Sequence, residues 1–129
     1  MSTGLHEQGI VTIHDQVVSL VAQRWAKAFQ TGLEQTPWAD LQEPCDIVGW
    51  QVGSAGNTME WMAEVETDES IRSTQTVSGW KKVSMQGVPF YLFVPRGSKE
   101  SVQKLAGDAC VPLSGIYEYT FVNGLCQVL

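Results

Sequence analysis

The chain has 129 residues, of which 43% are hydrophobic and 17% are charged, and it contains five tryptophans. This length and composition predict a single globular domain over residues 1–129 and exclude a generally disordered chain. The formal net charge of -6 argues against tight, non-specific binding to nucleic acid, which requires a basic face. A local basic patch remains compatible with this charge, because several cations occur late in the chain: Lys81, Lys82, Arg96, Lys99 and Lys104.

Cysteine content and hydropathy exclude further classes of protein. Cys45, Cys110 and Cys126 form no C-x-x-C pair, and an odd number of cysteines cannot complete a disulfide framework, so reduced thiols are expected. Two histidines are too few to complete a zinc site with these cysteines. The sequence has no apolar run of about 20 residues, and its start, "MSTGLHEQGI", lacks the basic and apolar regions of a signal peptide. We therefore expect a cytoplasmic protein with no membrane partner.

The first periodic segment, "TIHDQVVSLVAQRWAKAFQTGL", predicts a helix over residues 12–33. Thr12 followed by Asp15 is typical of a helix start, and Gly32 is a natural stop. His14 falls in the first turn, where we expect an exposed and structurally neutral side chain. Apolar residues recur three and four positions apart on one helical face: Val17, Leu20, Val21, Trp25, Ala28 and Phe29.

The next segments predict a loop, a β-hairpin and a second helix. Residues 34–44, "EQTPWADLQEP", contain two prolines and should form a loop. Two β-rich runs, residues 45–52 and 58–67, flank the segment "GSAGN" and predict an antiparallel hairpin with a loop of about five residues. Residues 70–87 predict a weaker helix that ends at Gly87. Its core-facing residues should be Ile71, Val77, Trp80 and Val83.

The C-terminal third predicts alternating strands and a helix. "VPFYLFVP", residues 88–95, is apolar throughout and is typical of a strand buried in the middle of a sheet. Residues 97–109 predict a short crossover helix, and residues 115–122 predict a strand. A turn at Asn123-Gly124 then leads to a strand over residues 125–129 at the sheet edge. The order α-β-β-α-β-α-β(β) predicts an α/β (α+β) fold, with a mixed β-sheet flanked by helices.

The segment "MEWMAEVETDES" places carboxylates on one face of a predicted strand. Glu64 and Glu66 should be neighbours, with Cα atoms about 6 to 7 Å apart. An antiparallel hairpin brings the start of its first strand beside the end of its second, so Asp46 should lie near both. Mg²⁺ held by one or two carboxylates would remove the repulsion between these like charges. Strand alternation assigns two faces: Met59, Trp61, Ala63 and Val65 on one, Glu60, Met62, Glu64 and Glu66 on the other.

Each of these residue types also has a simpler interpretation. Alternating Glu is typical of the solvated face of a half-exposed strand. Lys81 and Lys82 are consistent with a solvated helix face. Tryptophans can stack on nucleic-acid bases, but the spacing of Trp25, Trp61 and Trp80 favours packing in the core.

"PCD", Pro44 to Asp46, and "EVE", Glu64 to Glu66, stand where a known superfamily has an Asp and a Glu-x-Lys. In this order of motifs the chain resembles the PD-(D/E)xK nuclease superfamily, the restriction-endonuclease-like fold of many restriction enzymes and Holliday-junction resolvases. The run from "AEVETDES" to "PFYLFVPRGSKE" also looks like a group of small bacterial proteins with that fold. The resemblance covers roughly residues 11–122 and implies a helix, a β-meander, a crossover helix and a further strand.

Two departures from the family pattern concern its chemistry. Glu66 replaces the family lysine, which helps to activate water, although some restriction enzymes of this fold have Glu there. Family lysines sometimes migrate to the following helix, which makes Lys81 or Lys82 a candidate. The first predicted helix also has no interior Glu, which many members use as an extra metal ligand. Its available substitutes are Asp15, Gln16 and Gln23.

The resemblance implies metal-dependent hydrolysis of DNA phosphodiesters, with Mg²⁺ or Mn²⁺ as the cofactor. Asp46 and Glu64 would hold the ion, with the Val65 carbonyl as a further ligand. Glu66 would position or deprotonate the attacking water, and Lys81 or Lys82 would balance charge at the phosphate.

The alternative is a catalytically degenerate member of the same fold, which acts as a protein-interaction or assembly subunit. The net charge, the missing lysine and the missing helix Glu favour this alternative. Its partner would be a second copy of the chain or another protein. A third interpretation is a structural protomer that assembles through the edge formed by residues 115–129.

Overall fold

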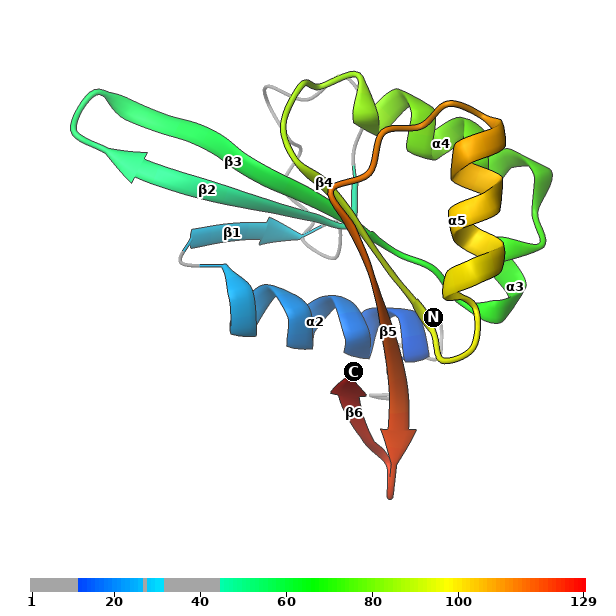
Figure 1. Ribbon diagram of the computed structural model, residues 1–129. Helices are drawn as coiled ribbons and strands as arrows, with labels where there is room; N and C mark the ends of the chain where they lie inside the picture. The colour runs from blue at the N-terminus through cyan, green and yellow to red at the C-terminus, as the bar shows by residue number, and fades with distance from the viewer. Residues whose placement is uncertain (1–11, 27, 32–44) are drawn as a thin grey trace, which may run out of the picture.

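A computed structural model describes residues 12–26, 28–31 and 45–129 of the chain. The predicted loop over residues 34–44 therefore lies outside the described residues, as does Trp38. Six strands form one mixed sheet in the order β1-β2-β3-β4-β5-β6 (Figure 1). The strands are β1 (Ala28–Thr31), β2 (Ile47–Gly53), β3 (Gly56–Val65), β4 (Phe90–Pro95), β5 (Gly115–Val122) and β6 (Leu125–Val128). The helices are α2 (Ile13–Trp25), α3 (Asp68–Ile71), α4 (Thr74–Ser84) and α5 (Lys99–Asp108).

The sheet combines an antiparallel meander with two parallel crossovers. β1, β2 and β3 pair antiparallel in succession, whereas β4 pairs parallel with both β3 and β5. The crossovers run through α3 and α4 and then through α5, which agrees with the predicted mixed sheet flanked by helices. β4 lies inside the sheet and β6 at its edge, as the sequence predicts. Among the helices of the described ranges, none has both the length and the apolar character needed to cross a bilayer.

Helix α2 starts where the sequence predicts but ends earlier. The Thr12 side chain caps it by accepting a hydrogen bond from the Asp15 backbone N–H at 3.1 Å. The prediction that the helix continues to Gly32 is wrong, because residues 28–31 form β1 and pair with β2. Trp25 and Phe29 are accordingly 48% and 41% exposed, and neither is the core residue that the periodicity suggested. The backbone hydrogen bonds available at the edge of the meander override the helical pattern here.

The β2-β3 hairpin is antiparallel but tighter and less regular than predicted. Gly53 pairs with Gly56, so the loop has two residues in place of the predicted five or so. Trp61 pairs with Gly49 and Met59 pairs with Trp50, which leaves Glu60 in a β-bulge. The bulge moves Met59 to the opposite face from Trp61, and the alternation predicted for Met59 is therefore wrong.

Helix α2 covers one face of the sheet, and α4 and α5 cover the other (Figure 1). An apolar cluster lies on each face. On one face, Val17, Val18, Val21 and Ala22 of α2 pack against strand residues Ile47, Ala63, Val65, Phe93 and Tyr119. On the other face, α4 and α5 pack through Trp80, Val83, Val102 and Ala106 onto Val48, Met62, Leu92, Val94 and Ile116. The predicted helix over residues 70–87 is divided into α3 and α4 at Arg72 and Ser73, and Gly87 follows it with φ +80°.

Replacing Gly49 with alanine should destabilise the protein. A Cβ atom at Gly49 would lie 2.4 Å from the Trp61 indole, so the ring would have to move. Overpacking of this kind lowers the free energy of unfolding by about 1–3 kcal/mol. The matched control is Gly79→Ala in α4, where a Cβ meets nothing within 4 Å and helix propensity should add up to about 1 kcal/mol of stability. Urea denaturation would measure both changes, and equal midpoints for the two variants would contradict this packing.

Candidate functional site

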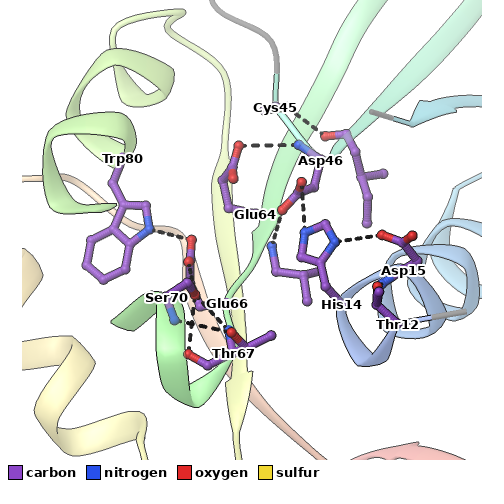
Figure 2. A network of polar contacts seen from close by, with 12 residues as sticks. Thr12, His14, Asp15, Cys45, Asp46, Glu64, Glu66, Thr67, Ser70 and Trp80 are labelled. Carbon is purple, nitrogen blue, oxygen red and sulfur yellow. Dashed lines mark hydrogen bonds and ion pairs between the residues drawn. The ribbon is translucent and has the colours of Figure 1, made fainter. Parts of the chain in front are cut away.

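The hairpin register places Asp46 beside Glu64. Ile47 pairs with Ala63, so the residue before β2 lies opposite the next residue of β3. The Asp46 backbone N–H donates a hydrogen bond to Glu64 Oε1 at 3.3 Å, and the Val65 N–H donates to Asp46 Oδ2 at 2.7 Å (Figure 2). The two carboxyl groups predicted to share one region therefore do so.

Glu66 lies just beyond the end of β3 and joins three parts of the fold. Its Oε1 accepts from the Ser70 hydroxyl at 2.6 Å, and its Oε2 accepts from Trp80 Nε1–H at 2.8 Å. Its backbone carbonyl accepts from the Tyr119 hydroxyl at 2.7 Å. Glu66 is 5% exposed, so these contacts satisfy a buried carboxylate. In Figure 2, Trp80 points from α4 toward Glu66, while Ser70 approaches it from α3.

Ser70 is held in place by the turn that starts α3. The Thr67 hydroxyl accepts from the Ser70 N–H at 3.2 Å, and the Ser70 hydroxyl accepts from the Thr67 N–H at 2.8 Å. This reciprocal pair is a capping box. It fixes the hydroxyl that Glu66 binds, so the position of the Glu66 carboxylate depends on how α3 begins.

His14 supplies a cation that the sequence interpretation missed. Its Nε2 lies 3.1 Å from Asp46 Oδ1, and its Nδ1 lies 3.0 Å from Asp15 Oδ1 (Figure 2). The hydrogen bond to Asp46 is the main reason why the pKa of His14 rises from 6.5 to about 9, against the opposing effect of burial. The prediction that His14 is exposed and structurally neutral is wrong, because the side chain is partly buried and contacts two carboxylates. No signal in the sequence shows that the first turn of α2 meets the start of β2.

Burial and mutual repulsion control the protonation of the carboxylates. Burial, then the charges of Asp46 and Glu66, raise the pKa of Glu64 well above its ordinary value. Burial also raises the pKa of Glu66, although its bonds to Ser70 and Trp80 oppose that shift. Nearby Cys45 is a buried thiol whose pKa is raised by burial and then by the charges of Glu64 and Asp46. Its Sγ donates a hydrogen bond to the Ile47 carbonyl at 3.1 Å. The site favours a proton or another cation at Glu64.

Lys81 and Lys82 lie on α4 directly after Trp80, and both are exposed. Trp80 faces the core, so the two lysines follow it onto the outer side of the helix. Within the described ranges, neither lysine forms an ion pair with Asp46, Glu64 or Glu66. The structure brings Asp46, Glu64 and Glu66 into one region and adds His14 to them.

The donor set suits an oxygen-binding cation. Among the residues with described positions, no group of three or more His, Cys, Asp or Glu side chains is arranged to hold a metal ion. Asp46 and Glu64 still offer two adjacent carboxyl groups, and Mg²⁺ is commonly bound by one or two carboxylates with water and phosphate oxygens. Carboxylate oxygens of this kind match Mg²⁺ or Mn²⁺. In this structure both Asp46 oxygens have protein partners, His14 Nε2 and the Val65 N–H, so an ion would have to replace or share these contacts.

A scan against protein-family models and searches of curated proteins and of solved structures find no match to this chain. The contacts around Asp46, Glu64, Glu66 and His14 are consequently the basis for its proposed function.

The contact with Asp46 should be visible in the titration of His14. We expect a pKa of about 9 in the folded protein, above the ordinary 6.5, so the stabilisation is full below pH 6.5 and is lost as the pH rises toward 9. Asp46→Asn should lower this pKa, because it removes the main cause of the shift. Nuclear magnetic resonance of the imidazole protons would measure it, with His14→Gln to assign the signal. A wild-type value near 6.5 would contradict the contact.

Proposed function

We propose that the chain is a metal-dependent nuclease-like domain that hydrolyses DNA phosphodiesters at the Asp46–Glu64 site. The observation that carries this proposal is the hairpin contact between Asp46 and Glu64, in which the Asp46 backbone N–H donates to Glu64 Oε1 and the pKa of Glu64 is raised well above its ordinary value. Burial is the main cause of this shift, and the charges of Asp46 and Glu66 add to it. A divalent cation would offset the repulsion between these charges. Metal binding would therefore explain why these carboxylates lie together, whereas a solvated strand face would not require it.

The order of elements supports the same proposal. α2 is followed by the meander of β1, β2 and β3, then by the crossover through α3 and α4, and then by β4. This is the succession of helix, meander, crossover helix and strand that the resemblance to the PD-(D/E)xK superfamily implies. β1, which the sequence did not predict, supplies the third strand of the meander.

Within this proposal, Asp46 and Glu64 would hold the ion, with the Val65 carbonyl as a further ligand. A bound Mg²⁺ or Mn²⁺ would polarise the phosphate and lower the pKa of the attacking water. His14, which lies beside Asp46 in the metal-free protein, is the nearest candidate for the charge-balancing role of the family lysine. Lys81 and Lys82 are exposed on α4 and, within the described ranges, form no ion pair with these carboxylates, which makes His14 the better candidate.

The environment of Glu66 favours a second candidate, a catalytically degenerate domain that acts as a protein-interaction or assembly subunit. Both carboxylate oxygens of Glu66 already accept hydrogen bonds, from Ser70 and from Trp80. A general base needs an oxygen directed at the water that it deprotonates. In this candidate Glu66 would only anchor α3 and α4 to the end of β3.

Cleavage of DNA in Mn²⁺, compared with cleavage in chelator, tests the proposal. We expect Asp46→Asn to slow cleavage at least about 100-fold, since even residues that only support a metal ligand contribute 10- to 100-fold. Glu60→Gln is the matched control, because Glu60 is an exposed carboxylate in the bulge of the same strand. Wild-type protein without metal-dependent cleavage would favour the second candidate. Cleavage that Asp46→Asn leaves unchanged would contradict the site.

A further inference from the structure

Five aromatic side chains line a pocket of about 250 Å³ on the α2 face of the sheet. They come from α2, β3, β4 and β5, and they are Trp25, Trp61, Tyr91, Phe93 and Tyr117. This face is opposite to the one on which Trp80 packs. None of Asp46, Glu64, Glu66 and His14 lines this pocket, so it is separate from the carboxylate site.

The rings of the pocket are held in place by one another. Phe93 and Tyr117 stack with centroids 5.4 Å apart and an interplanar angle of 26°, and Tyr91 lies 6.1 Å from Tyr117. Trp25 lies 6.0 Å from Phe93, and Trp61 meets Tyr91 edge-on at 84°. Contacts of this kind restrict ring motion, so the binding surface is formed in advance.

Two glycines allow the rings to lie close to the backbone. A Cβ at Gly49 would lie 2.4 Å from the Trp61 indole, and a Cβ at Gly115 would lie 3.2 Å from the Tyr91 ring. Any side chain at Gly49 would therefore push the Trp61 ring aside. Glycine at this position therefore leaves room for the Trp61 ring to lie against the backbone.

Two rings of the pocket remain accessible to a ligand. Trp25 is 48% exposed and Tyr117 is 43% exposed, although burial of such large rings is strongly favourable. The Arg24 guanidinium lies 5.5 Å from the centroid of the Trp25 ring. Among the described residues, no acidic side chain lines the pocket. An anionic group attached to a planar ring would find both an aromatic surface and a cation at this position.

We propose that this pocket binds an unstacked base of a single-stranded nucleic acid, while Arg24 contacts the adjoining phosphate. Every base offers a π-face, and proteins that hold single strands without reading their sequence combine stacking on aromatic side chains with positive charge along the backbone. Arg24 supplies that charge at this pocket, and the net charge of -6 limits the expected affinity. A volume of about 250 Å³ is below the range of pockets for drug-sized ligands and suits one ring system. The choice of nucleic acid rests on the proposed nuclease function, whereas the pocket itself does not.

Binding without hydrolysis tests this proposal. The probe is a fluorescein-labelled oligothymidylate of about 12 nucleotides, titrated in chelator and followed by anisotropy, beside an abasic strand with the same number of phosphates. We expect the abasic strand to bind at least about tenfold more weakly. Trp25→Ala and Tyr117→Ala should each weaken oligothymidylate binding by about fivefold to about 150-fold, from stacking worth about 1–3 kcal/mol per base. Trp25→Phe should keep most of the affinity, because it keeps a π-face.

The matched control is Leu125→Ala, which removes an exposed apolar side chain on β6, outside the pocket. Thermal melts would show that each variant is folded. Equal affinity for both strands, no binding to either, or no loss in Trp25→Ala would overturn the proposal. A dimer that dissociates in Trp25→Ala, without oligonucleotide binding, would also overturn it. Cleavage without base-dependent binding would support the nuclease function and contradict the base-binding pocket. Base-dependent binding without cleavage would support the pocket and contradict the nuclease function.

Discussion

Replacing Trp80 with alanine should lower the free energy of unfolding by about 3–5 kcal/mol. Trp80 is 1% exposed and belongs to the cluster that joins α4 to the sheet. The substitution would leave a cavity there, and it would also remove the Nε1–H that donates to Glu66. Urea denaturation followed by circular dichroism would measure the loss. A change below 1 kcal/mol would contradict the central position of this side chain.

Trp80→Phe separates the two effects of that substitution. Phenylalanine keeps most of the buried volume but leaves Glu66 Oε2 without its donor. An unsatisfied buried acceptor costs about 1–3 kcal/mol, and more when it is charged. Adding Glu66→Gln to Trp80→Phe should recover part of this loss, because an amide is less costly to bury than a carboxylate. Additive losses in the double variant would show that the contact between Trp80 and Glu66 contributes little.

Glu64→Gln, in contrast, should raise the free energy of unfolding of the metal-free protein at pH 8. The folded-state pKa of Glu64 is raised above its ordinary value of 4.5. Its contribution is therefore full below pH 4.5 and is lost as the pH rises through the folded-state pKa. Glutamine removes this loss, so we expect a gain of about 0.5–2 kcal/mol at pH 8, the range typical of single stabilising substitutions.

The comparison of wild type and Glu64→Gln at two pH values completes this prediction. The difference in the free energy of unfolding should shrink as the pH falls toward 4.5, because wild-type Glu64 then carries a proton. Glu60→Gln, in the exposed bulge, should show no such dependence on pH. Destabilisation by Glu64→Gln at pH 8 would mean that the Glu64 carboxylate has a compensating partner in the metal-free protein.

The contact between Asp46 and Glu64 could be predicted from the sequence because both of its premises are local. Strand alternation has a period of two, and an antiparallel hairpin brings its outer ends together whatever the loop length. The wrong loop length therefore did not change which residues meet. The same pattern failed for Met59, because a bulge at Glu60 reverses the alternation and leaves no clear signal in the sequence.

Tertiary contacts account for the features that the sequence did not reveal. Apolar residues at helical spacing extend to Phe29, but pairing with β2 turns residues 28–31 into a strand. The salt bridge between His14 and Asp46 joins the start of a helix to the start of a strand, and hydrophobic periodicity cannot predict a contact of this kind. Trp80 was predicted in the core, and the general need of a buried indole N–H for an acceptor could have pointed to Glu66.

Stabilisation of the folded protein by Mn²⁺ tests the metal site most directly. An ion that binds only the folded state adds about 2.7 kcal/mol to the free energy of unfolding at 100 times its dissociation constant. We expect Mn²⁺ to raise the thermal midpoint of the wild type and of Glu60→Gln at pH 8, and to leave those of Asp46→Asn and Glu64→Gln unchanged. An equal response in all four proteins, or none in the wild type, would contradict a cation site at Asp46 and Glu64.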